Sequence, residues 1–173
     1  MNPANTKFSI EPLAKYHNRE EFSCGNEELD RYFKIAASQD RKRNIAVPYV
    51  IVNLENPQII IGYYTLSMTS IYLGELPNSI AKKLPKYPLI GVTLIGRLAV
   101  DNNYQGMGWG KLLVMDSLYK SLEASKQVAS FAVVVDAIDK RSVKFYQRFN
   151  FQAFPEQPFK LFRTMKNIAQ AFA

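Results

Sequence analysis

Apolar residues in the first half of the chain follow a helical spacing first and an extended spacing afterwards. From Asn26 to Arg43 they recur every three or four positions, which predicts an amphipathic helix with Asn26 as its cap. Val47 to Leu54 and Ile59 to Leu73 are rich in Val, Ile and Tyr, so two strands separated by Asn56-Pro57 are expected to form a hairpin. The prolines and lysines between Pro77 and Pro88 predict a loop with room for one short helix.

The second half of the chain alternates strand and helix patterns. A continuous apolar strand leads through a turn to the only glycine cluster and then to an amphipathic helix. The predicted elements are a strand at Val92–Val100, a helix at Lys111–Ala124, a strand at Ala129–Val135, a helix at Asp139–Asn150, and a strand pair at Phe151–Phe154 and Phe159–Met165. A run of strands followed by this alternation predicts an α/β fold with a mixed sheet and helices on both faces.

Composition narrows the class of protein. The 173 residues fit one domain over positions 1–173, and 47% hydrophobic with 21% charged residues is typical of globular chains. Cys24 is the only cysteine and His17 the only histidine, so neither a disulfide framework nor a metal site is expected. Without a signal pattern or an apolar stretch of membrane length, we expect a cytoplasmic protein that does not bind membranes.

The charge balance suggests polyanionic partners. Lysine and arginine number 22 against 15 acidic residues, a formal charge of +7. Such an excess attracts nucleic acids, nucleotide cofactors or acidic proteins, but ordinary solubility explains it equally well. The densest cationic run is Arg41-Lys42-Arg43, which is the first candidate for contact with RNA phosphates.

A glycine cluster lies between the predicted strand and helix, where free backbone N–H groups at a helix start can bind phosphate. A P-loop is excluded because Lys111 is followed by Leu112 instead of Ser or Thr. A dinucleotide-binding fingerprint is excluded because Lys111 occupies the position of its last glycine. The spacing that fits is Gln105-x-x-Gly108-x-Gly110.

That spacing resembles the pyrophosphate loop of the GCN5-related N-acetyltransferases (GNAT), which reads Gln/Arg-x-x-Gly-x-Gly/Ala. Two flanking segments add to the resemblance: Gly96 to Asp101 precedes the loop, and Phe145 to Phe151 places a tyrosine ahead of an Asn-Phe turn. The resemblance runs from about Phe8 to Met165 and is strongest to acetyltransferase toxins of bacterial toxin–antitoxin pairs. It implies the GNAT fold, a central, mostly antiparallel sheet with a splayed parallel strand pair and helices on both faces.

The resemblance also implies roles for the motif residues. Acetyl-CoA, the acetyl donor, would pair its pantetheine arm with the main chain of Leu98 and Val100 and its pyrophosphate with the loop. Tyr146 is the implied catalytic residue, a proton donor to the departing CoA sulfur. Trp109 and Met107 are expected to pack, so only their N–H groups would bind. The implied cofactor-binding residues are Leu98, Ala99, Val100, Gln105, Gly106, Met107, Gly108, Trp109, Gly110, Lys111, and Asp139, which stands where many relatives carry Asn.

Three functions stay open at this point. The resemblance implies a toxin that acetylates the α-amine of aminoacyl-tRNA and inhibits translation, held in a repressor complex by a ribbon-helix-helix antitoxin, with a homodimer as an option. The second function is acetylation of a small amine or a protein amine, with the basic surface serving solubility. The third is a non-catalytic nucleotide-sensing or RNA-binding module, which the intact Tyr146 and glycine loop disfavour.

Overall fold

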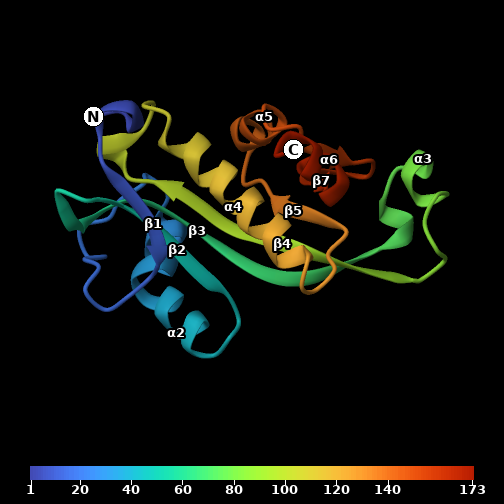
Figure 1. Ribbon diagram of the computed structural model, residues 1–173, viewed down its shortest axis with the longest axis horizontal. Coiled ribbons are helices and arrows are strands. Elements are labelled where there is room, and N and C mark those ends of the chain that lie inside the picture. The colour runs from blue at the N-terminus through green and yellow to red at the C-terminus, as the bar shows by residue number, and fades with distance from the viewer. The chain divides into compact units, whose positions relative to one another are not determined.

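The computed structural model describes residues 1–173 and divides them into two compact units. The first unit comprises Met1–Ser67 and Gly96–Ser117, and the second comprises Met68–Ile95 and Leu118–Ala173. Seven strands follow the order β1 (Phe8–Pro12), β2 (Val47–Asn53), β3 (Asn56–Tyr72), β4 (Leu89–Val100), β5 (Ala132–Asp136), β7 (Gln157–Thr164) and β6 (Gln152–Phe154). Figure 1 shows the ribbon with most of these strands labelled. The predicted mixed α/β sheet is confirmed, since β4 and β5 are parallel and the other registered pairs are antiparallel. That the chain forms one domain stays a prediction.

Antiparallel strands form the sheet of the first unit. β1 (Phe8–Pro12) pairs with β2 (Val47–Asn53), which pairs with β3 (Asn56–Tyr72). The register of β2 and β3 shifts near Val52, so that Asn53 lies opposite Asn56 across a tight hairpin. β3 therefore starts before Ile59, the predicted first residue, because Pro57 is tolerated near the start of a strand.

The helix predicted from Asn26 to Arg43 forms as three consecutive segments. They are α1 (Glu27–Arg31), the π-helix η2 (Tyr32–Ala36) and α2 (Ala37–Lys42). Asn26 caps α1 as predicted, since its side chain accepts a hydrogen bond from the Leu29 N–H at 3.1 Å. The π-helical segment buries the consecutive residues Tyr32 and Phe33. Such π segments are often found at functional sites.

Both faces of this part of the sheet are covered. On one face Phe33 stacks on Tyr63 with ring centroids 4.2 Å apart, in a cluster that includes Val50. On the other face Trp109, the first residue of α4 (Trp109–Ser125), packs in a cluster with Ile51. Neighbouring residues of β2 thus point to opposite faces, as strand geometry requires. The prediction of helices on both faces is confirmed for this unit.

The second unit is built around β5 (Ala132–Asp136). Over Thr93–Ile95, β4 (Leu89–Val100) pairs with β5 in parallel. β7 (Gln157–Thr164) pairs with β5 antiparallel, and β6 (Gln152–Phe154) pairs with β7. α5 (Lys140–Gln147) precedes β6, and α6 (Met165–Ala171) follows β7.

Most element boundaries of the second half differ from the prediction by a few residues. α5 ends at Gln147 rather than Asn150, and Asn150 takes a left-handed conformation with φ of 60°. α6 was not predicted, because only Met165 and Ile168 of its residues are buried and its cap, Thr164, lies within a strand pattern. Shorter elements are η1 (Pro3–Asn5), η3 (Leu73–Glu75), α3 (Asn78–Ala81), which is the predicted short helix, and η4 (Asn102–Tyr104). None of the helices has the length and apolar character needed to cross a membrane.

Candidate functional site

The end of β4 has one backbone edge directed away from β3. The Asp101 N–H donates to the Ile61 carbonyl at 2.8 Å, so this residue faces β3. Because backbone groups alternate between the two edges of a strand, the N–H groups of Leu98 and Val100 point to the opposite edge. The parallel register with β5 ends at Ile95. The end of β4 can therefore offer main-chain hydrogen bonds to an extended ligand, as the resemblance implies for pantetheine.

Side chains alternate along the same residues. Leu98 and Val100 are half-buried against the cluster that contains Trp109. Ala99 is buried in the cluster that contains Phe33, and Arg97 is exposed. A ligand that pairs with the backbone of β4 therefore needs no side-chain movement at these positions.

The glycine loop takes a conformation that other residues disfavour. Gly106 and Gly108 have φ angles of 75° and 97°. An added Cβ would meet nothing within 4 Å at Gly106 and only Pro3, at 3.9 Å, at Gly108. The two glycines thus serve backbone conformation rather than packing. Gly110 lies in the first turn of α4, a helix of 17 residues whose N-terminal end favours an anion.

Gln105 fixes the start of this loop to neighbouring backbone. Its Nε2 donates to the Val100 carbonyl at 2.9 Å and to the Cys24 carbonyl at 2.8 Å. It also donates to Asn102 Oδ1 at 3.3 Å. The side chain of Gln105 therefore shapes the loop, and its amide nitrogen is already engaged.

Asp101 fixes the other side of the turn and was not among the predicted site residues. It is 5% exposed, and its carboxylate accepts hydrogen bonds from the N–H groups of Asn103, at 2.9 Å, and Ser23, at 3.1 Å. The first bond is an Asx turn, which an aspartate directly after a strand and two residues before an asparagine could have indicated. Asp101 is a positioning residue for the loop.

The remaining loop side chains lie in different environments. Trp109 is 1% exposed, donates from Nε1 to the Met1 carbonyl at 3.2 Å and meets the Phe8 ring edge-on at 5.5 Å. It packs as predicted. Met107 is 38% exposed, so the prediction that its side chain packs was wrong. Met107 lies between two left-handed glycines, and this conformation turns it outward. Lys111 is exposed on the first turn of α4.

The second unit holds the other two predicted residues. Tyr146 on α5 is 8% exposed, and its ring meets Phe145 and Phe151 edge-on at 5.2 and 5.5 Å. Burial raises the pKa of Tyr146 far above its usual value, so the phenol is protonated throughout the neutral range. Asp139 is the N-cap of α5 and accepts from the Ser142 N–H at 2.7 Å, a bond that lowers the pKa of its carboxyl. Asp139 thus has a structural role of its own.

The cationic run lies at the end of α2 in the first unit. Arg41, Lys42 and Arg43 are all exposed. Arg41 also donates from Nη1 to the Leu13 carbonyl at 2.9 Å, which ties α2 to the segment after β1. The cationic run is accessible to a polyanion, although one N–H of the Arg41 guanidinium is already bonded to the Leu13 carbonyl.

The only cysteine and the only histidine are not poised for catalysis. His17 is 4% exposed; its Nδ1 accepts from the Ala14 N–H at 2.8 Å, so Nε2 carries the proton that faces Glu11, also at 2.8 Å. Burial raises the pKa of the Cys24 thiol to about 11, so little reactive thiolate forms at neutral pH. Both residues anchor local structure.

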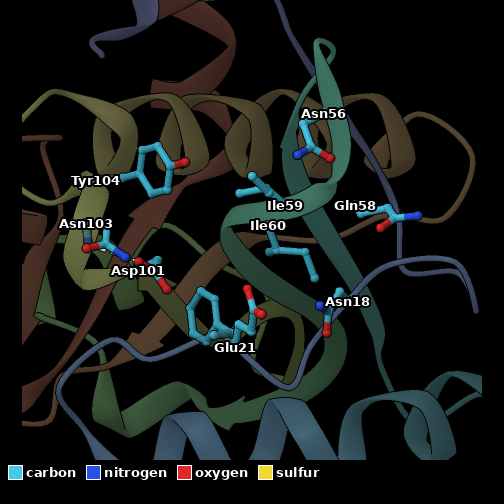
Figure 2. Close-up of a pocket in the computed structure, with 10 residues that line it drawn as sticks. Asn18, Glu21, Asn56, Gln58, Ile59, Ile60, Asp101, Asn103 and Tyr104 are labelled. Carbon is cyan, nitrogen blue, oxygen red and sulfur yellow. Dashed lines mark hydrogen bonds between the residues drawn. The ribbon is translucent and has the colours of Figure 1, made fainter.

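A polar cavity of about 360 Å³ lies in the first unit, and the sequence did not indicate it. Figure 2 shows Asn56, Gln58, Ile59 and Ile60 of β3 on one side and Asp101, Asn103 and Tyr104 on the other. Asn18 and the carboxylate of Glu21 complete its polar lining, together with Phe22. Since no Lys or Arg lines it, this cavity is not suited to a phosphate.

The model of the acetyltransferase (GNAT) family matches residues 11–151 of the chain. The probable toxin TacT of Sinorhizobium fredii is 27% identical over an alignment of 175 residues that covers 96% of this chain and 96% of that protein. A tRNA-acetylating toxin of Mycobacterium tuberculosis is 27% identical over 146 residues, which are 84% of this chain and 85% of that protein.

Solved structures of toxins are similar over the same range. One is AtaT in complex with acetyl-methionyl-tRNA, with a TM-score of 0.89, 28% identity, and coverage of 96% of this chain and 100% of the other. Another is a Tyr-to-Phe mutant of AtaT bound to acetyl-CoA and to the C-terminus of the antitoxin AtaR. For that structure the TM-score is 0.80 and the identity 25%, with coverage of 96% of this chain and 98% of the other.

Proposed function

The chain belongs to the acetyltransferase (GNAT) family, and on that premise we propose that it is a toxin that acetylates aminoacyl-tRNA. It takes the acetyl group from acetyl-CoA, transfers it to the α-amine of the amino acid and thereby inhibits translation. The observation that carries the proposal is the pair of left-handed glycines ahead of α4, in a chain similar over 84% of its length to a tRNA-acetylating toxin. No particular observation favours a small amine or a protein as acceptor.

The donor site is assigned to residues of β4 and the glycine loop. The N–H groups of Leu98 and Val100 would bind the pantetheine amides, and the exposed backbone between Gly106 and Gly110 would bind the pyrophosphate. Lys111, exposed on the first turn of α4, adds positive charge near the phosphates. Gln105 holds the loop through its bond to the Val100 carbonyl.

The chemistry requires one nucleophile and one proton donor. The neutral α-amine attacks the thioester carbon, the C–S bond breaks as the new C–N bond forms, and the amine loses a proton to solvent. The sulfur takes a proton or a hydrogen bond from the Tyr146 hydroxyl, which burial keeps protonated, and solvent returns any proton that the tyrosine gives up. A side-chain base is unnecessary, because an α-amino group has a pKa of about 8 and is substantially neutral at physiological pH.

The partners follow from the same proposal. A small antitoxin of the ribbon-helix-helix class would neutralise the protein, with an acidic or flexible tail drawn to the surface that carries the +7 charge. Toxin and antitoxin together would form a repressor complex, and the toxin itself can act as a homodimer. Cytoplasmic location follows from a tRNA substrate.

The direct test is a purified translation system. We expect the protein to stop protein synthesis only when acetyl-CoA is supplied, and co-purified antitoxin to restore synthesis. A matched control is the same system supplied with CoA in place of acetyl-CoA. Full synthesis in the presence of the protein and acetyl-CoA, with acetyl-CoA binding intact, would point to a small amine or a protein as the acceptor.

A further inference from the structure

Arg97 is an exposed arginine held in one position by its surroundings. Its guanidinium carbon lies 3.5 Å from the centre of the Tyr32 ring, in the stacked geometry of a cation–π contact. Its backbone N–H donates to Thr65 Oγ1 at 3.1 Å. Gly96 permits this bond, because a Cβ there would lie 2.9 Å from the same hydroxyl. Both ends of Arg97 are therefore fixed within the first unit.

The platform under Arg97 is rigid. Tyr32 is 9% exposed, and its hydroxyl donates to Asp40 Oδ2 at 2.8 Å. Its other neighbour is Tyr63, stacked at 6.5 Å, which in turn stacks on Phe33 at 4.2 Å. The π-helix η2 supplies both Tyr32 and Phe33 to this stack. An arginine on such a platform loses little side-chain entropy when it binds a ligand.

Arg97 has no acidic partner that would explain this arrangement. Within the first unit no carboxylate lies at ion-pair distance from its guanidinium. Asp40, which is linked to Arg97 only through Tyr32, accepts its hydrogen bond from the Tyr32 hydroxyl. A stacked guanidinium presents its N–H edge outward, and this edge matches two oxygens of a phosphate.

The position of Arg97 along β4 places it next to the backbone edge assigned to the donor. Arg97 directly precedes Leu98, the first residue of the backbone edge assigned to the pantetheine arm, and its side chain lies on the opposite face of β4 from Leu98. In aminoacyl-tRNA the phosphate of the terminal nucleotide is one nucleoside away from the reacting amine. A guanidinium one residue before the backbone edge that binds acetyl-CoA is well placed to bind that phosphate.

We propose that Arg97, stacked on Tyr32, binds the phosphate of the 3′-terminal nucleotide of the acceptor and positions the amine beside the thioester. This inference rests on the proposed function, since it takes aminoacyl-tRNA as the acceptor. It makes Arg97 a substrate-binding residue that acts through KM, in addition to the general attraction by Arg41, Lys42 and Arg43.

The test compares Arg97→Gln with Arg31→Gln, which removes one exposed cation from α1 in the same unit. Acetylation of charged tRNA is measured at several salt concentrations, and acetyl-CoA affinity by calorimetry. For Arg97→Gln we expect KM for tRNA to rise roughly tenfold to a hundredfold, with acetyl-CoA affinity unchanged. The slope of log(kcat/KM) against log salt should shrink by about 0.7, the value for one phosphate of a single strand. Arg31→Gln should leave KM for tRNA and the salt slope close to their wild-type values.

Two further variants separate stacking from charge. Arg97→Lys keeps the charge and loses the planar fork, so KM should rise while most of the salt slope is retained. Tyr32→Leu removes the ring on which Arg97 stacks and keeps the charge of Arg97, so KM should rise while most of the salt slope is retained, and an unchanged KM would contradict the stacked geometry. If Arg97→Gln behaves like Arg31→Gln, this proposal is wrong and the proposed function stands. If the wild-type protein does not acetylate charged tRNA at all, both are wrong.

Discussion

The glycine loop gives the sharpest prediction about acetyl-CoA binding. Replacing Gly108 by alanine adds one methyl group, and the structure leaves space for it, since the nearest atom is on Pro3 at 3.9 Å. The effect must therefore come from the backbone: at φ of 97° an L-residue is disfavoured by about 1–2 kcal/mol. Because the exposed loop can relax to another conformation, most of this energy should appear as weaker acetyl-CoA binding and little of it as a lower free energy of unfolding.

A loss of about 1–2 kcal/mol corresponds to a roughly 5- to 30-fold weaker affinity for acetyl-CoA. The assay is calorimetric titration of Gly108→Ala with acetyl-CoA, with thermal unfolding measured in parallel. Gly91→Ala is the matched control, because Gly91 lies on β4 without a left-handed φ and an added Cβ there meets nothing within 4 Å. If folded Gly108→Ala binds acetyl-CoA as tightly as Gly91→Ala does, the loop does not hold the pyrophosphate and the reasoning is refuted.

Three other predictions follow from the described residues. Changing Arg41, Lys42 and Arg43 together to glutamate should weaken binding of every charged tRNA alike and flatten the salt dependence of binding, with acetyl-CoA affinity unchanged. If the variant and the wild type acetylate charged tRNA at equal rates with equal salt dependence at two salt concentrations, these residues do not contact RNA. Asp101→Asn keeps the shape and weakens the bonds that order the turn, so acetyl-CoA affinity should fall a few-fold in calorimetry, and an unchanged affinity would separate Asp101 from the loop. Burial raises the pKa of Tyr64, so folding favours its protonated form. In denaturant titrations the free energy of unfolding should therefore stay constant up to about pH 10, the unfolded pKa of tyrosine, and fall as the pH rises further. A constant free energy of unfolding above that pH would contradict this prediction.

The sequence predicted the fold best where local patterns and burial agree. The helical region capped by Asn26, the strand before the glycine loop and the mixed sheet were all predicted, although the helix forms as three segments and the strand starts at Leu89 rather than Val92. The π-helical turn at Tyr32 could not be foreseen, since the period of apolar residues does not separate it from an α-helix. α6 was not predicted, because few of its residues are buried and they leave no clear apolar pattern.

The candidate site was predictable only in its backbone features. The motif spacing predicted a glycine loop directly before a helix, and Gly106 and Gly108 lie there ahead of α4; their left-handed φ angles were not predicted. The contacts made by side chains depend on residues distant in sequence: Asp101 bonds to Ser23, and Arg97 stacks on Tyr32. Spacing along the chain carries no signal for such pairs, and the roles of Tyr146 and the other proposed site residues stay predictions.

The most direct test of the central claim is transfer of labelled acetyl from acetyl-CoA to charged tRNA, by wild type and by Tyr146→Phe. The product is identified as N-acetyl amino acid after alkaline release, and the deacylated tRNA pool is the control. The account predicts labelled N-acetyl amino acid from charged tRNA only, and a ~10²–10⁴-fold slower rate for Tyr146→Phe with acetyl-CoA affinity nearly unchanged. The packing of the ring against Phe145 and Phe151 survives that substitution. Label that never reaches the charged tRNA, or an equal rate for the two proteins, would contradict the account.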